Sequence, residues 1–230
     1  MSRAVLFDTE TTGLDPLKGD RVIEIAALEL DNDLPTGKSF HRLIHPQRDV
    51  PDEVVRIHGI TLEKLRDAPR FEEIVDDMLE FFGEGALIAH NAPFDFNFLD
   101  AELARAQRPA LDRTRMVDTL ILAKTRFPGM PNSLDALCRR FTIDLTERTT
   151  HNALLDCKLL AEVYVELTGG RQRGLSLATD DQGTLSIATY KSEGPRTPRL
   201  MVPDAATLAA HATFLGKFKS PIWIAEDPPK

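Results

Sequence analysis

The stretch Phe7-Asp8-Thr9-Glu10-Thr11-Thr12-Gly13-Leu14 carries the strongest local signal in the chain. It continues an apolar run, residues 4–9, that predicts a short buried strand. Because side chains alternate along a strand, Asp8 and Glu10 are expected on the same face. Two neighbouring carboxylates repel, and the pKa of each would rise unless a cation lay between them. Mg²⁺ or Mn²⁺, which prefer oxygen ligands, would supply that cation. The alternative is that the strand has already ended and both acids are solvated.

Outward from this strand, the hydrophobic pattern predicts an α/β domain. Residues 21–30, 38–44 and 85–90 are expected to form further strands, with hairpin turns at 19–20 and 32–37. Helical spacing or helix-start signals mark residues 51–58, 71–82, 93–107, 118–126, 133–141 and 152–167. Three opening strands followed by alternating strands and helices predict a mixed sheet flanked by helices. No internal repeat is evident.

The composition changes after Gly170, which divides the chain into three regions. Residues 1–170 are expected to form one globular domain, and residues 171–200, rich in Gly, Ser, Thr, Asp and Pro, a flexible linker. Residues 201–230 regain helical spacing, with apolar positions at Leu208, Leu215 and Phe218 and the only tryptophan, Trp223. This apolar stripe is expected either to dock on a partner, since aromatic residues dominate interfaces, or to fold back onto the first region.

Bulk composition favours a cytoplasmic protein. Hydrophobic residues make up 42% of the 230 residues, enough for a substantial core. No apolar run approaches the roughly 18 residues that a membrane span requires, and the N-terminus has no signal-peptide pattern. The two cysteines, Cys138 and Cys157, fall in segments expected to be helical and do not suggest a disulfide framework.

The net charge of the chain is negative, which is unlike a protein that binds nucleic acid by itself. Residues 1–170 hold 20 Lys and Arg against 30 Asp and Glu, a net charge of −10, whereas residues 171–230 hold 8 against 6, a net charge of +2. A protein that binds DNA by itself needs a basic surface to release counterions. We therefore expect weak intrinsic affinity and delivery to the substrate by partners.

Two further acids lie at the starts of predicted helices. Asp95 falls in a first turn, where an acid often only stabilises the helix, but it shares a face with apolar residues. Asp156 lies on the stripe of the last long helix that should face the sheet, so it must meet a cation, form a structural salt bridge or lose its charge. His151, five residues earlier, is a candidate base or simply a surface or capping residue.

Four acids on three separate elements, with one histidine nearby, suit phosphodiester cleavage with two cations. In such sites the ions stand about 3.5–4 Å apart and stabilise the attacking and leaving oxygens. A general base with a pKa near neutrality removes the proton of the attacking water. Here Asp8, Glu10, Asp95 and Asp156 would hold the ions, and His151 is the candidate base.

These segments resemble the motifs of the DEDDh exonuclease family, which has a ribonuclease H-like fold. The family pattern of Asp-x-Glu, a distant Asp and His-x4-Asp is matched in order by Asp8, Glu10, Asp95, His151 and Asp156. Residues 127–129, 132–138 and 153–170 are similar to the proofreading branch of the family, so the resemblance is close over residues 3–170 and loose in the tail.

The resemblance implies a five-stranded sheet, two Mg²⁺ or Mn²⁺ ions and removal of nucleotides from DNA 3′ ends. It implies that Asp8, Glu10 and Asp156 bind the ions directly, that Asp95 assists through water and that His151 activates the attacking water. It also implies nucleotide contacts by Thr9, Glu53 and His58, together with the acids Asp8, Glu10 and Asp156.

For the tail, the resemblance implies three kinds of protein partner: a replicative polymerase subunit, a sliding clamp and a small accessory subunit. Residues 201–230 would dock on the polymerase. Gln172, Leu175 and Leu177 would form the clamp-binding peptide, for which an ordinary linker is an equal alternative. Two other functions stay open: a free-standing exonuclease that acts on RNA 3′ ends, and a scaffold without activity.

Overall fold

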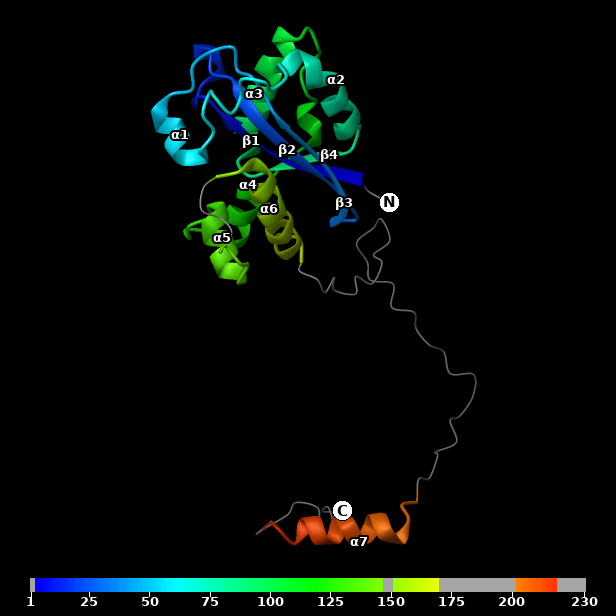
Figure 1. Cartoon of the computed structure of the whole chain (residues 1–230). Helices are drawn as coiled ribbons and strands as arrows, with labels where there is room; N and C mark the ends of the chain where they lie inside the picture. Colours follow the sequence, from blue (N-terminus) through cyan, green and yellow to red (C-terminus); the bar gives the residue numbers. More distant parts are fainter. Residues whose placement is uncertain (1–2, 147–150, 170–201, 219–230) are drawn as a thin grey trace, which may run out of the picture. The chain divides into compact units, whose positions relative to one another are not determined.

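The structure is a computed structural model of the whole chain, and it describes residues 3–146, 151–169 and 202–218. It divides into two compact units, Met1–Ser176 and Leu177–Lys230. The first unit contains a five-stranded mixed sheet with helices on both faces (Figure 1). The sheet confirms the predicted α/β class and the ribonuclease H-like fold.

The strands are β1 (Arg3–Thr11), β2 (Val22–Asp31), β3 (Leu34–Leu43), β4 (Ala86–Ala89) and β5 (Met116–Asp118), in the order β3-β2-β1-β4-β5. The pairs β1–β2 and β2–β3 are antiparallel, whereas β1–β4 and β4–β5 are parallel. This order puts β1, with its acidic motif, in the centre of the sheet.

The helices of the first unit are α1 (Asp52–His58), α2 (Phe71–Phe82), α3 (Ala92–Arg105), α4 (Thr119–Arg126), α5 (Leu134–Phe141) and α6 (Ala153–Leu167). Short 3-10 turns lie at Pro16–Lys18 and Arg113–Arg115. Helices α2 and α3 lie on one side of the sheet and α4–α6 on the other (Figure 1).

The side chains of β1 alternate between the two faces of the sheet and contribute to the hydrophobic core on each face. Phe7 faces α2 and α3, where its ring centroid is 5.2 Å from that of Phe82 and 5.8 Å from that of Phe96. Ala4 and Leu6 belong to the other core, with residues of α4, α5 and α6. Because successive side chains point to opposite faces, the next even-numbered residues, Asp8 and Glu10, follow Leu6 toward the α6 side.

Sequence patterns located most elements within one to three residues but missed two details. Strand β3 begins at Leu34, so the predicted 32–37 turn is shorter and consists of Asn32 and Asp33, both with positive φ. Asn and Asp tolerate this conformation better than most residues. The first six residues of β3 are exposed and therefore lack the hydrophobic alternation of a half-buried strand. This explains why the predicted strand began only at residue 38. Strand β5 has only three residues, all partly exposed, too short for a periodicity.

In the second unit the structure describes one helix, α7 (Ala205–Leu215). The side chain of Asp204 accepts a hydrogen bond from the amide of Thr207 and thereby caps the N-terminus of the helix. Among the described helices of the chain, none has the length and apolar character needed to cross a membrane.

Candidate active site

The centre of the site is the carboxyl end of β1. Asp8 is partly buried and Glu10 retains 9% of its exposure. The pKa of Asp8 lies well above its ordinary value because of burial and then because of the negative charges of Asp95, Glu10 and Asp156. The solvated alternative for these two acids is therefore wrong, and the site favours a cation.

Asp95 reaches β1 from the first turn of α3. Its Oδ1 accepts hydrogen bonds from the amide of Thr9 at 3.1 Å and from the hydroxyl of Thr9 at 2.7 Å. Burial nevertheless raises the pKa of Asp95 to about 7, since the bonds to Thr9 offset only part of the desolvation. Asp95 is thus fixed to the strand that carries the other acids, and it is not a solvated helix-stabilising charge.

Asp156 approaches from the first turn of α6, on the opposite side of the sheet. It is buried, and its Oδ2 lies 3.3 Å from Nδ1 of His151, whose side chain is about half exposed. The amide of His151 donates to the carbonyl of Ile57, so the backbone before α6 is held near the end of α1.

Together these residues fit a divalent cation. Glu10, His151 and Asp156 each present one ligand atom, and the three atoms lie within 4.8 Å of one another. Asp8 lines the same cleft as His151 and Asp156, a space of about 600 Å³. Carboxylate oxygens with an imidazole suit Mn²⁺ or Mg²⁺, and an acid with a raised pKa shows where positive charge would be favourable.

The cleft is also lined by residues that sequence reasoning did not select. They come from the start of α3, from α4 and from the start of α5: His90, Asn91, Leu120, Ser133, Leu134 and Asp135. Nδ1 of His90 is hydrogen-bonded to the hydroxyl of Thr119 at 2.9 Å, and burial lowers its pKa. The acids were selected because their charge stands out in an apolar pattern, and a neutral histidine held by a hydrogen bond gives no such signal in the sequence.

The two helix-borne acids belong to a short repeat that the sequence analysis overlooked. His90-Asn91-Ala92-Pro93-Phe94-Asp95 and His151-Asn152-Ala153-Leu154-Leu155-Asp156 share the pattern His-Asn-Ala-x-x-Asp. Each acid is the fourth residue of its helix. Burial classes agree residue by residue over 91–99 and 152–160. The repeated segment covers only the starts of two helices, α3 and α6, so it is too short to indicate a duplicated domain.

The residues expected to contact a nucleotide are placed in different surroundings. Thr9 is buried beside Asp95. His58, at the end of α1, is buried, and its Nδ1 accepts from the amide of Ile60 at 3.0 Å, which leaves the proton on Nε2. Among the buried side-chain nitrogen and oxygen atoms described, Nε2 of His58 alone has no hydrogen-bond partner. Glu53 is exposed in the first turn of α1 and does not line the cleft of the acids.

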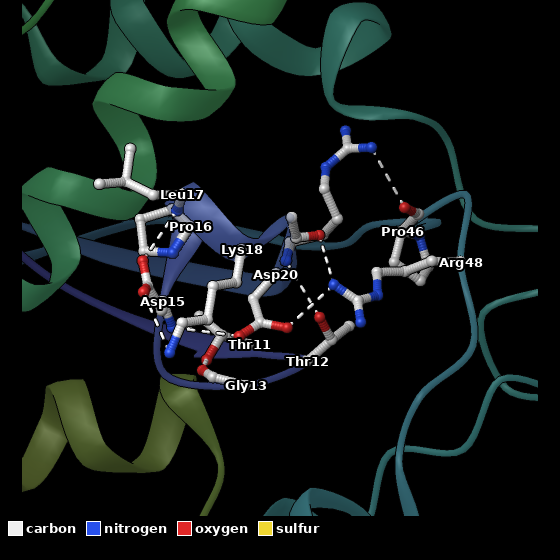
Figure 2. Close-up of polar contacts among 12 residues, drawn as sticks. Thr11, Thr12, Gly13, Asp15, Pro16, Leu17, Lys18, Asp20, Pro46 and Arg48 are labelled. Carbon is white, nitrogen blue, oxygen red and sulfur yellow. Dashed lines mark hydrogen bonds and ion pairs between the residues drawn. The ribbon is translucent and has the colours of Figure 1, made fainter.

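The loop after β1 is held by an internal polar network (Figure 2). The carboxylate of Asp20 accepts from the amide of Asp15 at 3.1 Å and from Arg48 at 2.9 Å. A Cβ on Gly13 would stand 2.2 Å from that carboxylate, so glycine is required there. The hydroxyl of Thr12 accepts from the amide of Arg21 at 3.0 Å, which ties the loop to the start of β2. The segment adjoining Glu10 therefore has a fixed conformation.

A mixed sheet of this order, with acids converging from β1, α3 and α6, defines a ribonuclease H-like, metal-dependent nuclease. The model of the exonuclease family matches residues 5–164. A DNA polymerase III subunit epsilon of Rickettsia felis is 46% identical over 218 residues, covering 93% of this chain and 95% of that protein. The epsilon subunit of Escherichia coli K12 is 38% identical over 216 residues, covering 90% and 86%.

Solved exonuclease structures share the fold. Exonuclease X in complex with 5′ overhanging duplex DNA matches with a TM-score of 0.57 at 25% identity, over 73% of this chain and 91% of that one. An Escherichia coli exonuclease I complex with single-stranded DNA and zinc matches with a TM-score of 0.62 at 19% identity, over 72% and 41%. The chain belongs to the exonuclease family and, within it, to the DNA polymerase III epsilon subunits. It is a 3′→5′ exonuclease, and the resemblance to the DEDDh family is confirmed.

The residues expected to contact protein partners lie partly outside the described residues. Gln172, Leu175, Leu177 and Trp223 fall there. In and just after α7, Leu208 and Phe218 are about half exposed, whereas Leu215 is buried. Phe214, which the sequence analysis did not select, is also about half exposed, with its ring centroid 5.1 Å from that of Phe218.

Proposed function

We propose that this exonuclease proofreads DNA during replication, removing mononucleotides from single-stranded or frayed 3′ ends with two Mg²⁺ or Mn²⁺ ions. The observation that carries the proposal is the convergence of acids around Asp8, with Glu10, His151 and Asp156 within 4.8 Å of one another at their ligand atoms. A mispaired end frays more readily than a paired one, so a site that accepts only single strands already selects errors.

The four acids would hold the ions in two ways. Asp8, Glu10 and Asp156 would bind them directly, because all three carboxylates face the α6 side of the sheet or come from α6. Asp95 would act indirectly, through water, because one of its oxygens already accepts two bonds from Thr9. When bound, the ions would stabilise the charge that develops on the attacking and leaving oxygens.

His151 is the proposed general base. Its exposed ring beside Asp156 can reach solvent and accept the proton of the attacking water. Water oxygen then bonds to phosphorus, the bond from phosphorus to the 3′ oxygen of the preceding nucleotide breaks, and that oxygen takes up a proton from solvent. The products are a 5′-mononucleotide and a DNA chain with a new 3′-hydroxyl.

His58 and Thr9 are proposed to contact the terminal nucleotide, with Glu53 reaching it from the exposed side of α1. The unused Nε2–H of His58 supports this role, because a buried donor without a partner is costly unless a ligand accepts from it. Burial lowers the pKa of His58, so the ring is neutral and donates one hydrogen bond.

A substrate comparison tests the proposed specificity. Turnover of matched DNA and RNA oligonucleotides with labelled 3′ ends is expected to favour DNA, with a further preference for mispaired over paired primer ends. Faster cleavage of RNA would support the alternative, a free-standing exoribonuclease. Similarity to epsilon subunits over more than 90% of the chain, the tail included, favours DNA.

Substitution of a central acid tests the mechanism. Asp8→Asn should abolish hydrolysis at saturating Mn²⁺ while leaving the fold intact, since the carboxylate is already costly to bury. Glu29→Gln, on the distant end of β2, is the matched control and should cut DNA normally. If Asp8→Asn hydrolysed DNA at the full rate, the proposed metal site would not take part in the reaction. If the wild-type chain were inactive under all conditions, the scaffold function would be favoured.

The tail is proposed to dock on the catalytic (alpha) subunit of polymerase III through Leu208, Phe218 and Trp223, with Phe214 and Leu215 completing the apolar stripe. Leu208→Asp or Phe218→Asp should abolish co-elution with that subunit and leave nuclease turnover unchanged. His211→Gln, an exposed polar position on α7, should change neither. Retained co-elution of both apolar variants would refute the docking role.

Two further partners belong to the same proposal. Gln172, Leu175 and Leu177 would bind the sliding clamp, and a small theta-like accessory subunit would bind the first unit. The enzyme would work with them in the cytoplasm, where the chromosome is replicated. Clamp binding is tested by substituting Leu175 and Leu177 with Ala and measuring affinity by calorimetry, with unchanged affinity counting against the peptide.

A further inference from the structure

A fifth buried carboxylate lies beside the four that the motifs identify. Glu24 is on β2, directly opposite Glu10 in the antiparallel pair, and retains 1% of its exposure. Its negative charge is one of those that raise the pKa of Asp8. Burying another carboxylate next to four acids is unfavourable unless hydrogen bonds compensate for its lost hydration.

The bonds of Glu24 lead to the start of α6. Its Oε2 accepts from the amide of Ala153, the first residue of the helix, at 3.2 Å. Its Oε1 accepts from the side-chain amide of Asn152 at 3.5 Å. The same Asn152 accepts from the amide of Leu155 at 3.0 Å, so one side chain links the carboxylate to the first turn.

His41 holds the carboxylate from the other side. It lies on β3, at the edge of the sheet, and its Nε2 is 2.7 Å from Oε1 of Glu24. Because a carboxylate only accepts, His41 is the donor. The ring is about one-third exposed, whereas Glu24 is buried, so the histidine connects the interior to the surface.

We propose that Glu24 is a positioning residue for the exonuclease reaction, held by His41, which fixes the start of α6 and thereby places His151 and Asp156. Those two residues flank the bonded segment: His151 precedes Asn152 and Asp156 follows one turn later. A small rotation or shift of the first turn would move both relative to Asp8 and Glu10, which belong to the fixed sheet. This inference rests on the proposed roles of His151 and Asp156.

The experiment compares two buried glutamates of the same strand. Glu24→Gln keeps an acceptor for Ala153 but loses the charge that His41 meets. Glu29→Gln is the matched control, since Glu29 is buried, ion-paired with Arg3 at 2.8 Å and opposite Val5, far along the strand from Glu10. In the full chain, kcat and KM are measured on a single-stranded DNA oligonucleotide, Mn²⁺ affinity by calorimetry and stability by Tm.

Glu24→Gln is expected to lower kcat and weaken Mn²⁺ binding by about 10- to 100-fold, with KM for DNA unchanged, as for other residues that orient metal ligands. Glu29→Gln should lower Tm without changing kcat, because its bonds to Arg3, Thr36 and Lys38 serve only the sheet. His41→Ala, at an accessible position, should lower kcat about three- to tenfold and serves as the second variant if Glu24→Gln does not fold.

The positioning role is overturned if kcat of folded Glu24→Gln stays within twofold of wild type, or if Glu29→Gln loses as much. It is also overturned if Glu24→Gln fails to fold and His41→Ala keeps full kcat. Asp156→Asn separates this result from the proposed function. A fully active Asp156→Asn refutes the site itself, whereas an inactive Asp156→Asn beside an active Glu24→Gln refutes only the positioning role.

Discussion

The two His-Asn-Ala-x-x-Asp segments, residues 90–95 and 151–156, differ in backbone although they share this pattern and, from the asparagine onward, the same burial classes. Asn91 is in the left-handed region, with φ 64°, and its amide donates to Asp118 at 3.0 Å. Asn152 is extended, with φ −149°, and caps its helix with its side chain. One helix therefore begins with a strained residue and the other with an ordinary N-cap.

The acids that end the segments differ in the same way. Asp95 accepts two bonds from the single residue Thr9. Asp156 lies beside the half-exposed His151 and near Glu10. The shared motif thus places one carboxylate against β1 from the α3 side of the sheet and another beside a half-exposed histidine in the cleft on the α6 side.

The largest expected effect separates these two acids. Asp156→Asn should lower kcat about 10³-fold, because it removes a proposed direct ligand of ions that would stabilise the transition state. Asp95→Asn should lower kcat about 10- to 100-fold, as expected for an indirect ligand. Single-turnover rates on a labelled DNA oligonucleotide at saturating Mn²⁺ measure both. Equal losses would mean that Asp95 is as directly involved as Asp156.

The acids of the candidate site could be predicted because a charged residue at an otherwise apolar position of a helix or strand is conspicuous in a sequence. Asp156 stands on an otherwise apolar helical stripe, and Asp8 and Glu10 end an apolar strand. Glu24 could not be selected in this way. It lies in a strand as one polar residue among apolar ones, which is also the pattern of a half-exposed strand, and only the pairing with Glu10 and the bond to Ala153 reveal its place.

The next effect separates the two histidines. His151→Gln should lower kcat about 10²-fold, since His151 is the proposed general base and the loss of such a base has this order of magnitude. His90→Gln should lower it less than about fivefold, because His90 lines the cleft but is neutral and bonded to Thr119. Both rates are measured at pH 8. A larger loss for His90→Gln would reverse the assignment of the base.

Most of the fold could be predicted for a related reason. Helix α2 was located to the residue because it has one apolar face and a sharp end at Gly83. Strand β5, with three residues, exists through its pairing with β4 and carries no signal of its own. The parallel order β1-β4-β5 likewise depends on contacts between distant segments, and it was not predicted from the sequence.

Removing one of the two bonds to Asp95 should have a smaller effect. Thr9→Val deletes the hydroxyl but keeps the amide donor, at a cost of about 1 kcal/mol for one hydrogen bond, or roughly fivefold in kcat. Thr9→Ser keeps the hydroxyl and is the control. Because the lost bond favoured the charged carboxylate, the pKa of Asp95 should rise further, and more Mn²⁺ should be needed for half-maximal rate. An unchanged Mn²⁺ requirement would show that Asp95 does not influence the ions.

The smallest effect is on stability and needs no substrate. The pKa of Asp95 is about 7 in the folded chain, against an ordinary value of 3.8. A raised pKa means that its contribution to stability is complete below pH 3.8 and is lost as pH rises through 7. In EDTA, Asp95→Asn should therefore raise Tm at pH 8, by about 2–4 °C for each kcal/mol removed, and much less at pH 5. Mn²⁺ should raise Tm of the wild type more at pH 8 than at pH 5, because protons compete with the ion for the carboxylates.

The control is Asp112→Asn, measured in the same way in EDTA. Asp112 is an exposed acid whose pKa is lowered by its bonds to Thr114, so this substitution should lower Tm at pH 8. If Asp95→Asn instead lowered Tm in EDTA at pH 8, its bonds to Thr9 would outweigh the cost of burying its charge, and the protein would not need a cation at this carboxylate.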